Sequence, residues 1–86
     1  MDDIMLSVID IARRHVKAES ASALDDPDVD LSALGVDSLE MVSFIFDLET
    51  SLSIEFPATM IVPETFRNVW TVSDAIRALY EKEDNA

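Results

Sequence analysis

"LGVDSLEMV", residues 34–42, contains the only glycine of the chain and predicts the start of a helix. Asp37 can accept backbone N–H groups of the following turn, and Glu40, three residues later, supplies the second half of a capping box. The helix is therefore predicted to begin at Ser38. Residues 38–52 contain neither proline nor glycine, so nothing in the sequence interrupts the helix before that point. The role of the serine at its first position becomes the main question.

Two apolar stripes follow the predicted helix. The first consists of Met41, Ile45, Leu48 and Leu52, at spacings of 4, 3 and 4. The second consists of Leu39, Val42 and Phe46 and ends on Glu49. Together they are wider than one helix contact needs. We expect the first stripe to be core and the second to lie on the surface, beside the exposed start of the helix.

The remaining segments predict an all-α fold. Apolar residues recur at helical spacing over residues 3–18 and again from a cap at Thr71 to about Lys82, with Asp74 returning the capping bond. A long loop, residues 19–37, separates the first two helices. A single helical turn is expected at "VPETF", residues 62–66, with Pro63 near its first position.

This pattern indicates a small bundle of three main helices plus one short helix, in a single domain over residues 1–86. The ordered core is expected to span about 3–82, and the tail "EKEDNA" should be frayed. After the second helix, Ile54 and Phe56 should point inward before Pro57 ends the segment.

Charge and composition exclude several classes of function. The chain has 18 acidic and 6 basic residues, a net charge of -12, and no cysteine. Such a surface repels nucleic acids and anionic membranes and favours basic protein surfaces as partners. Without cysteine there is no thiolate nucleophile or disulfide, so any thiol must be imported. Acids at the N-terminus and the lack of a long apolar stretch indicate a cytoplasmic protein, expected to be a monomer.

Catalytic and metal sites are poorly supported. A nucleophilic serine needs a nearby base, and the only histidine, His15, lies on the first predicted helix, at a surface or boundary position. The serine is not in a G-x-S-x-G motif either. The acids of "LDDPDVD", residues 24–30, lack the glycine and the final glutamate of a calcium-binding loop, and we interpret them as a solvated loop. We therefore expect no catalytic residue and no metal.

The motif resembles the attachment site of acyl and peptidyl carrier proteins, L-G-x-D-S-L-x-x-V. Further similarities are "LE" at 48–49, "IEFP" at 54–57 and "TVSDAI" at 71–76, in the same order and spacing. The resemblance implies that Ser38 receives 4'-phosphopantetheine from coenzyme A, and that the thiol of this arm holds acyl or aminoacyl groups as thioesters. It also implies that the protein is not an enzyme, and that Asp37 and Leu39 position the enzymes that act at Ser38.

The implied partners are a phosphopantetheinyl transferase, an acyl- or aminoacyl-loading ligase, and a downstream acyltransferase, synthase or thioesterase. Their candidate contacts, in addition to the motif, are Glu40, Val42, Phe46, Asp47 and Glu49. The fatty-acid type of this family is usually denser in acids along this helix, whereas here Ser43, Phe44 and Phe46 make it more aromatic. The tryptophan just before the last helix looks like that of the discrete D-alanyl and aminoacyl carriers. This similarity favours a free-standing carrier of a specialised pathway over one of fatty-acid synthesis.

Two other classes stay open. In a helical protein-interaction module without a prosthetic group, Ser38 would do no more than begin a helix. In a small hydrolase, the same serine would turn over activated esters.

Overall fold

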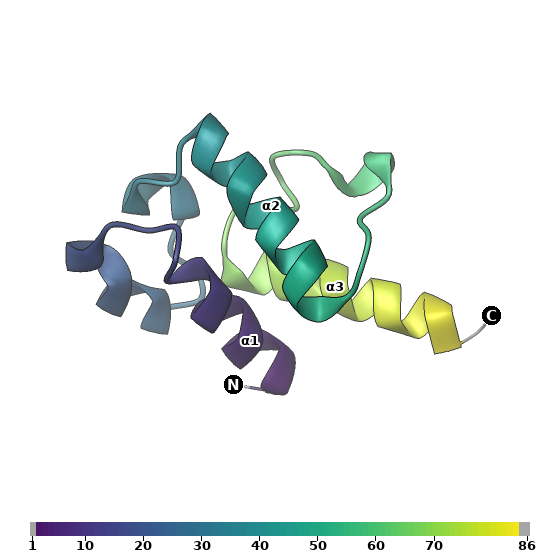
Figure 1. Cartoon of the computed structure of the whole chain (residues 1–86). Helices are drawn as coiled ribbons and strands as arrows, with labels where there is room; N and C mark the ends of the chain where they lie inside the picture. The colour runs from purple at the N-terminus through teal and green to yellow at the C-terminus, as the bar shows by residue number, and fades with distance from the viewer. Residues whose placement is uncertain (1, 85–86) are drawn as a thin grey trace.

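The computed structural model describes residues 2–84 of the chain, and its architecture is built from helices (Figure 1). The α-helices are α1 (Asp3–Ala12), α2 (Ser38–Leu52) and α3 (Val69–Asp84), and the 3-10 helices are η1 (Ala18–Asp25), η2 (Leu31–Leu34) and η3 (Ala58–Met60). Within residues 2–84 there is no strand, and the all-α fold class is confirmed. None of these helices has the length and apolarity needed to cross a membrane.

Helix α1 is shorter than its apolar period suggested. Asp2 caps it by accepting the N–H of Met5 at 2.9 Å, and it ends at Ala12 rather than near residue 18. The residues after Ala12 form a tighter turn, in which the backbone N–H of His15 donates to the carbonyl of Ala12, three residues back, at 2.9 Å. Val16 continues the apolar pattern because it packs against the core from this turn, outside the helix.

The segment 19–37 was predicted as a loop, but it contains most of η1 and all of η2. Leu24, Leu31 and Leu34 are buried in it. Its backbone is tied to the entry of α3, since the N–H of Leu31 donates to the carbonyl of Arg67 at 2.9 Å. Gly35 ends η2 in the left-handed region, with φ 93° and ψ 11°. This conformation explains the single glycine, because other residues adopt it at a cost.

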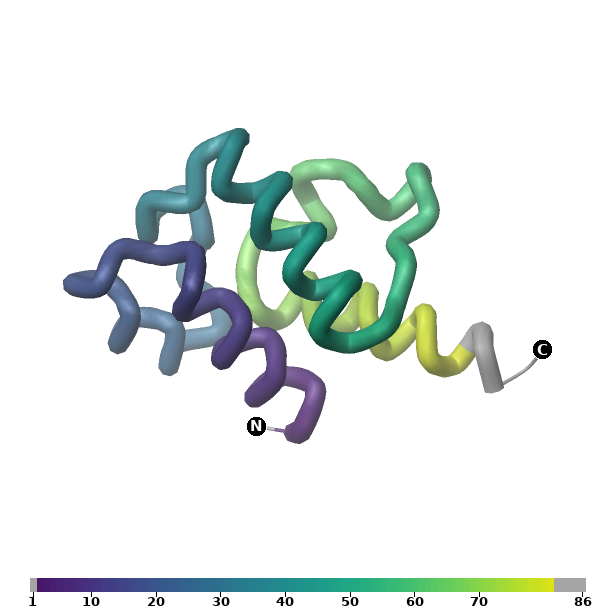
Figure 2. The backbone as a smooth tube through the Cα atoms, viewed as in Figure 1, coloured from purple at the N-terminus to yellow at the C-terminus, as the bar shows by residue number. Residues whose placement is uncertain are grey.

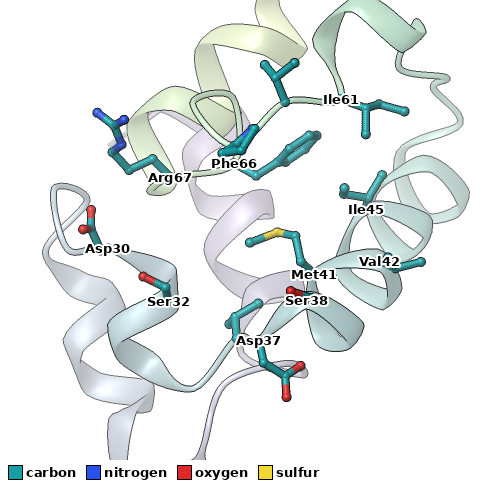
Figure 3. Close-up of a pocket in the computed structure, with 13 residues that line it drawn as sticks. Asp30, Ser32, Asp37, Ser38, Met41, Val42, Ile45, Ile61, Phe66 and Arg67 are labelled. Atoms are coloured by element: carbon teal, nitrogen blue, oxygen red, sulfur yellow. The ribbon is translucent and has the colours of Figure 1, made fainter.

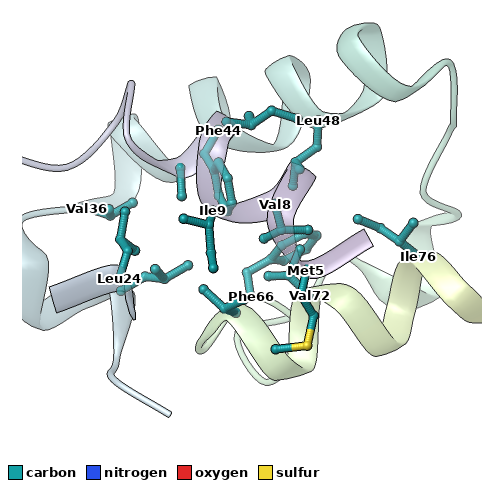
Figure 4. Close-up of a cluster of buried hydrophobic side chains, with 14 of the residues drawn as sticks. Met5, Val8, Ile9, Leu24, Val36, Phe44, Leu48, Phe66, Val72 and Ile76 are labelled. Carbon is teal, nitrogen blue, oxygen red and sulfur yellow. The ribbon is translucent and has the colours of Figure 1, made fainter. Parts of the chain in front are cut away.

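Helix α2 begins at Ser38, as predicted, and packs chiefly on α1. Leu48 of the first stripe is fully buried, and Met41, Ile45 and Leu52 are partly buried against the core. Phe44, which belongs to neither stripe, is also buried (Figure 4). The first stripe therefore belongs to the core, as expected. The largest fully buried side chain of the core, that of Phe44, lies outside both stripes.

The connection from α2 to α3 runs back beside α2 (Figure 2). It buries Ile54 and Phe56, as predicted. The short helix, however, is η3, and the expected helical turn at residues 62–66 consists instead of successive hydrogen-bonded turns. In these turns the N–H of Phe66 donates to the carbonyl of Pro63 at 3.2 Å.

Helix α3 starts two residues before the predicted cap at Thr71. Asn68 is the cap: its Oδ1 accepts the N–H of Thr71 at 2.9 Å, and Thr71 Oγ1 accepts the N–H of Asn68 at 3.1 Å. Asp74, expected to return a bond to Thr71, instead pairs with Arg77 at 2.8 Å. The earlier start buries Val69 on the same face as Val72 and Ile76.

Helix α3 continues to Asp84, two residues beyond the predicted end near Lys82. Residues 85–86 of the tail "EKEDNA", which was expected to be frayed, lie outside the described residues.

Candidate functional site

Ser38 is the first residue of α2 and is exposed. Asp37, just before it, caps the helix, because its Oδ1 accepts the N–H of Glu40 at 2.9 Å. No hydrogen bond engages the Ser38 hydroxyl within residues 2–84. The side chain is thus presented to solvent at a rigid helix start, with its oxygen available for reaction with a second molecule.

A groove of about 650 Å³ begins at Ser38 and lies between α2, η2 and the segment 61–67 (Figure 3). One wall is apolar and is formed by Met41, Val42, Ile45, Ile61, Val62, Pro63 and Phe66. The other wall carries polar side chains from Asp30, Ser32 and Arg67. An extended chain attached at Ser38 would have both apolar and hydrogen-bonding surface within reach.

The second stripe forms an exposed apolar patch, here defined as Leu39, Val42 and Phe46. Their exposed fractions are 82, 66 and 66 %. All three lie on α2 within a few turns of Ser38, which agrees with the surface position expected for this stripe. Apolar side chains gathered in this way on a small domain mark a contact surface for another molecule.

Glu40 and Asp47, two of the carboxylates on α2, are bound by His15. Its Nδ1 lies 2.7 Å from Glu40 Oε2, and its Nε2 lies 2.8 Å from Asp47 Oδ2. The ring is only 10 % exposed and is tilted against buried Phe44. Both ring nitrogens therefore contact α2 carboxylates, and among residues 2–84 the hydrogen bonds of His15 include none to a serine, the pair that a serine hydrolase requires.

Asp47 has further partners. Arg14 Nη1 donates to its Oδ1 at 3.0 Å, and the Ser51 hydroxyl donates to the same oxygen at 2.9 Å. The hydrogen bond from His15 is the main cause that lowers the pKa of the Asp47 carboxyl, with Ser51 and Arg14 adding to it against the effect of burial. Asp47 is thus held as a carboxylate at the junction of α1 and α2.

Glu49, the third carboxylate of α2, has a structural partner as well. Its Oε2 accepts the backbone N–H of Phe56 at 2.9 Å, which fastens the start of the segment after α2. The capping box predicted a second hydrogen bond, from the Asp37 backbone N–H to the Glu40 carboxylate. Glu40 Oε2 instead contacts His15 Nδ1.

The residues predicted around Ser38 are therefore brought together on one helix, and the structure adds His15 and Arg14 to them. His15 was predicted to lie at a surface or boundary position, without a role. The sequence feature that could have indicated its contacts with acids is its position in the basic run "RRH", residues 13–15, of a strongly acidic chain.

Comparison with protein families gives one match: a model described as "Phosphopantetheine attachment site" covers residues 7–76. The chain belongs to the phosphopantetheine attachment site family. This family carries covalently attached 4'-phosphopantetheine, and its carrier domains are generally not catalytic. Comparisons with curated proteins and with solved structures gave no match.

The geometry fits this prosthetic group. An exposed hydroxyl that has no hydrogen-bond partner among the described residues can accept the phosphate, and the groove that opens beside it has room for an extended arm. The helix N-terminus attracts the phosphate, whereas Asp37 and Glu40 repel it, so the charge of the surroundings alone does not favour attachment.

Proposed function

We propose that this chain is a single-domain carrier that tethers acyl or aminoacyl intermediates at Ser38 and delivers them to partner enzymes. The observation that carries the proposal is the exposed Ser38 hydroxyl, without a partner in the described chain, at the rigid start of α2 and at the mouth of the groove. The family match supports the prosthetic group, and the position of Ser38 in the motif supports it as the attachment residue.

In the attachment step, Ser38 Oγ attacks the phosphorus of coenzyme A that bears the pantetheine. A new O–P bond forms, the bond to the adenosine bisphosphate leaving group breaks, and the serine proton is released. The transferase must supply the base, because the described part of this chain offers none at hydrogen-bond distance from Ser38. Asp37 fixes the serine by capping α2, and Leu39 offers an apolar contact beside it. When attached, the group supplies the thiol on which cargo is held as a thioester.

The partners we propose are a phosphopantetheinyl transferase, a loading ligase for acyl or aminoacyl groups, and an acyltransferase, synthase or thioesterase that takes the cargo. They would contact α2 around Ser38, at Val42 and Phe46 and near Glu40, Asp47 and Glu49. We propose a specialised pathway, because α2 carries only these three acids, whereas the fatty-acid type is denser in acids along this helix.

Intact-mass measurement tests the proposal directly. The purified chain is incubated with coenzyme A, magnesium and a broad-specificity phosphopantetheinyl transferase, beside the variants Ser38→Ala and Ser43→Ala. Ser43 is also an exposed serine of α2 and is the matched control. We expect the mass gain of one phosphopantetheine on wild type and Ser43→Ala, and none on Ser38→Ala.

Two other outcomes would favour the alternative classes, an interaction module or a hydrolase. Absence of a mass gain on folded wild type, with a second transferase also tried, would favour a helical interaction module. Ester turnover by wild type that is lost in Ser38→Ala would favour a hydrolase.

A further inference from the structure

Arg67 stands apart from the other arginines of the chain. Arg13, Arg14 and Arg77 each form an ion pair with a carboxylate. The Arg67 side chain forms no ion pair and no hydrogen bond with the side chains that the structure describes, although the chain has 18 acidic and only 6 basic residues. It is exposed and lines the groove that begins at Ser38. Its guanidinium is therefore available to a ligand in that groove.

Asp30 and Ser32 bring two more polar groups to the same wall (Figure 3). Asp30 precedes η2, at a position where an aspartate side chain often caps, yet it makes no capping hydrogen bond. Ser32 is exposed, and its hydroxyl has no hydrogen-bond partner among residues 2–84. With Arg67, this wall offers a carboxylate that accepts hydrogen bonds, a guanidinium that donates them, and a hydroxyl that does both.

A backbone hydrogen bond keeps Asp30 and Arg67 next to each other. The N–H of Leu31, the residue after Asp30, donates to the carbonyl of Arg67 at 2.9 Å. The two side chains nevertheless form no ion pair with each other. Their backbone positions are set before a ligand arrives, so a ligand that contacts both has no backbone segment to order.

The charges on this wall favour a neutral ligand. An anion would meet the Asp30 carboxylate and the field of a chain with a net charge of -12, and a cation would meet Arg67. A neutral group that has one donor and one acceptor satisfies both side chains. A secondary amide is such a group, because its N–H matches the carboxylate and its carbonyl matches the guanidinium.

The opposite wall suits a chain in which amides alternate with apolar carbon. It contains Met41, Ile45 and Phe66. The 4'-phosphopantetheine arm has this composition: a carbon with two methyl groups lies near the phosphate, and a hydroxyl and two secondary amides follow before the thiol. An arm attached to Ser38 begins at the mouth of the groove, so both walls are offered to it.

We infer that the groove is a resting site for the pantetheine arm on its own carrier. In this site Asp30 accepts an amide N–H of the arm, Arg67 and Ser32 donate to an amide carbonyl, and Met41 and Ile45 contact the methyl groups. The inference rests on the proposed carrier function and adds to it the residues of this chain that hold the arm between visits to partner enzymes.

Hydrogen exchange of the arm amides, measured by NMR, tests the resting site. Coenzyme A labelled with ¹⁵N gives a holo chain in which only the arm amides are observed, and free phosphopantetheine is the reference. Both are measured at the same high salt, which screens the charge of the chain. We expect at least one arm amide to exchange roughly tenfold or more slowly than in the free compound.

Variants at the polar wall assign the protection. Asp30→Ala removes the acceptor, and Arg67→Met removes the donors but keeps an unbranched apolar stem. Each should bring exchange of the protected amide to within about twofold of the free compound. Asp28→Ala, at an exposed acid of the same segment, and Arg13→Met, at an arginine that does not line the groove, are the matched controls and should keep the protection. Circular dichroism checks that each variant is folded, and intact mass checks that it carries the arm.

The resting site is wrong if the arm amides of wild type exchange as fast as those of free phosphopantetheine. It is also wrong if Asp30→Ala and Arg67→Met change the protection no more than the controls do. In both cases Ser38 carries the arm and the carrier function stands. If Ser38 never acquires the arm, the carrier function and the resting site are both wrong.

Discussion

Nε2 of His15 lies 2.8 Å from Oδ2 of Asp47, and this contact joins the turn after α1 to the third turn of α2. It spans 32 residues of sequence and lies on the helix that carries Ser38. A contact between two side chains therefore ties the attachment helix to a turn that is distant in sequence.

Acid should destabilise the fold partly through Asp47. The pKa of its carboxyl is lowered from the ordinary 3.8, mainly by the hydrogen bond from His15, so the folded state binds this proton less readily than the unfolded chain. Stability from Asp47 is full above pH 3.8 and is lost as the pH falls through the lower value in the folded state.

Urea unfolding of wild type and Asp47→Asn as a function of pH checks this. At pH 7 the free energy of unfolding of the variant should be lower than that of wild type by roughly 1 to 3 kcal/mol. Below pH 4 it should fall less steeply with pH than that of wild type. A residual slope is expected because the pKa of Asp2 is also lowered, by the N–H of Met5 and by Arg77. Asp10→Asn, at an exposed acid of α1, is the control. Equal slopes in wild type and Asp47→Asn would show that the contact with His15 is not maintained in solution.

Replacing Asp37 separates capping from recognition. Asp37→Ala removes the acceptor of the Glu40 N–H and should cost about 1 kcal/mol of unfolding free energy. Asp37→Asn keeps an acceptor at the cap and should be nearly as stable as wild type. If the transferase nevertheless modifies the Asn variant more slowly, the charge of Asp37 contributes to recognition. An Ala variant as stable as wild type would show that the cap contributes nothing.

Two neighbouring phenylalanines of α2 should respond in opposite ways. Phe44 is buried beside His15, and Phe44→Ala should cost about 3 to 5 kcal/mol, measured by chemical denaturation. Phe46 is exposed, and Phe46→Ala should change stability by less than about 0.5 kcal/mol. The opposite ranking would mean that α2 is rotated about its axis relative to this structure.

Gly35 should resist substitution. With φ at 93°, an alanine there is strained, and its Cβ would lie 3.1 Å from Cγ of Lys17, so Gly35→Ala should cost about 1 to 2 kcal/mol. Repeating the change in a Lys17→Ala background removes the contact and leaves the backbone term. If the cost then disappears, the glycine is required for space and not for conformation.

The start of the attachment helix was predictable because its signals are local. Asp37, Ser38 and the absence of helix breakers set the beginning of α2, and the two stripes separated its core side from its exposed side. For α3 the predicted cap was Thr71 with Asp74, whereas in the structure Asn68 with Thr71 forms it. Burial of Val69 decides between them, and only the packed structure shows it.

The contacts of His15 could not be predicted, because their partners are 25 and 32 residues away. The period of α1 was misleading for a related reason: Val16 keeps the apolar spacing although the helix has ended. A hydrophobic period reports which residues are buried, and a tight turn can bury a residue as well as a helix does.

The walls of the groove differ in how they are held. On one side, Leu31 donates to the Arg67 carbonyl and Trp70 to the Pro27 carbonyl, so η2 and the entry of α3 form one backbone-linked unit. Within residues 2–84, α2 has no backbone hydrogen bond to that unit. A group bound in the groove would therefore meet one wall fixed by backbone hydrogen bonds between η2 and the entry of α3, and an opposite wall, α2, that in the described chain is held to it without any.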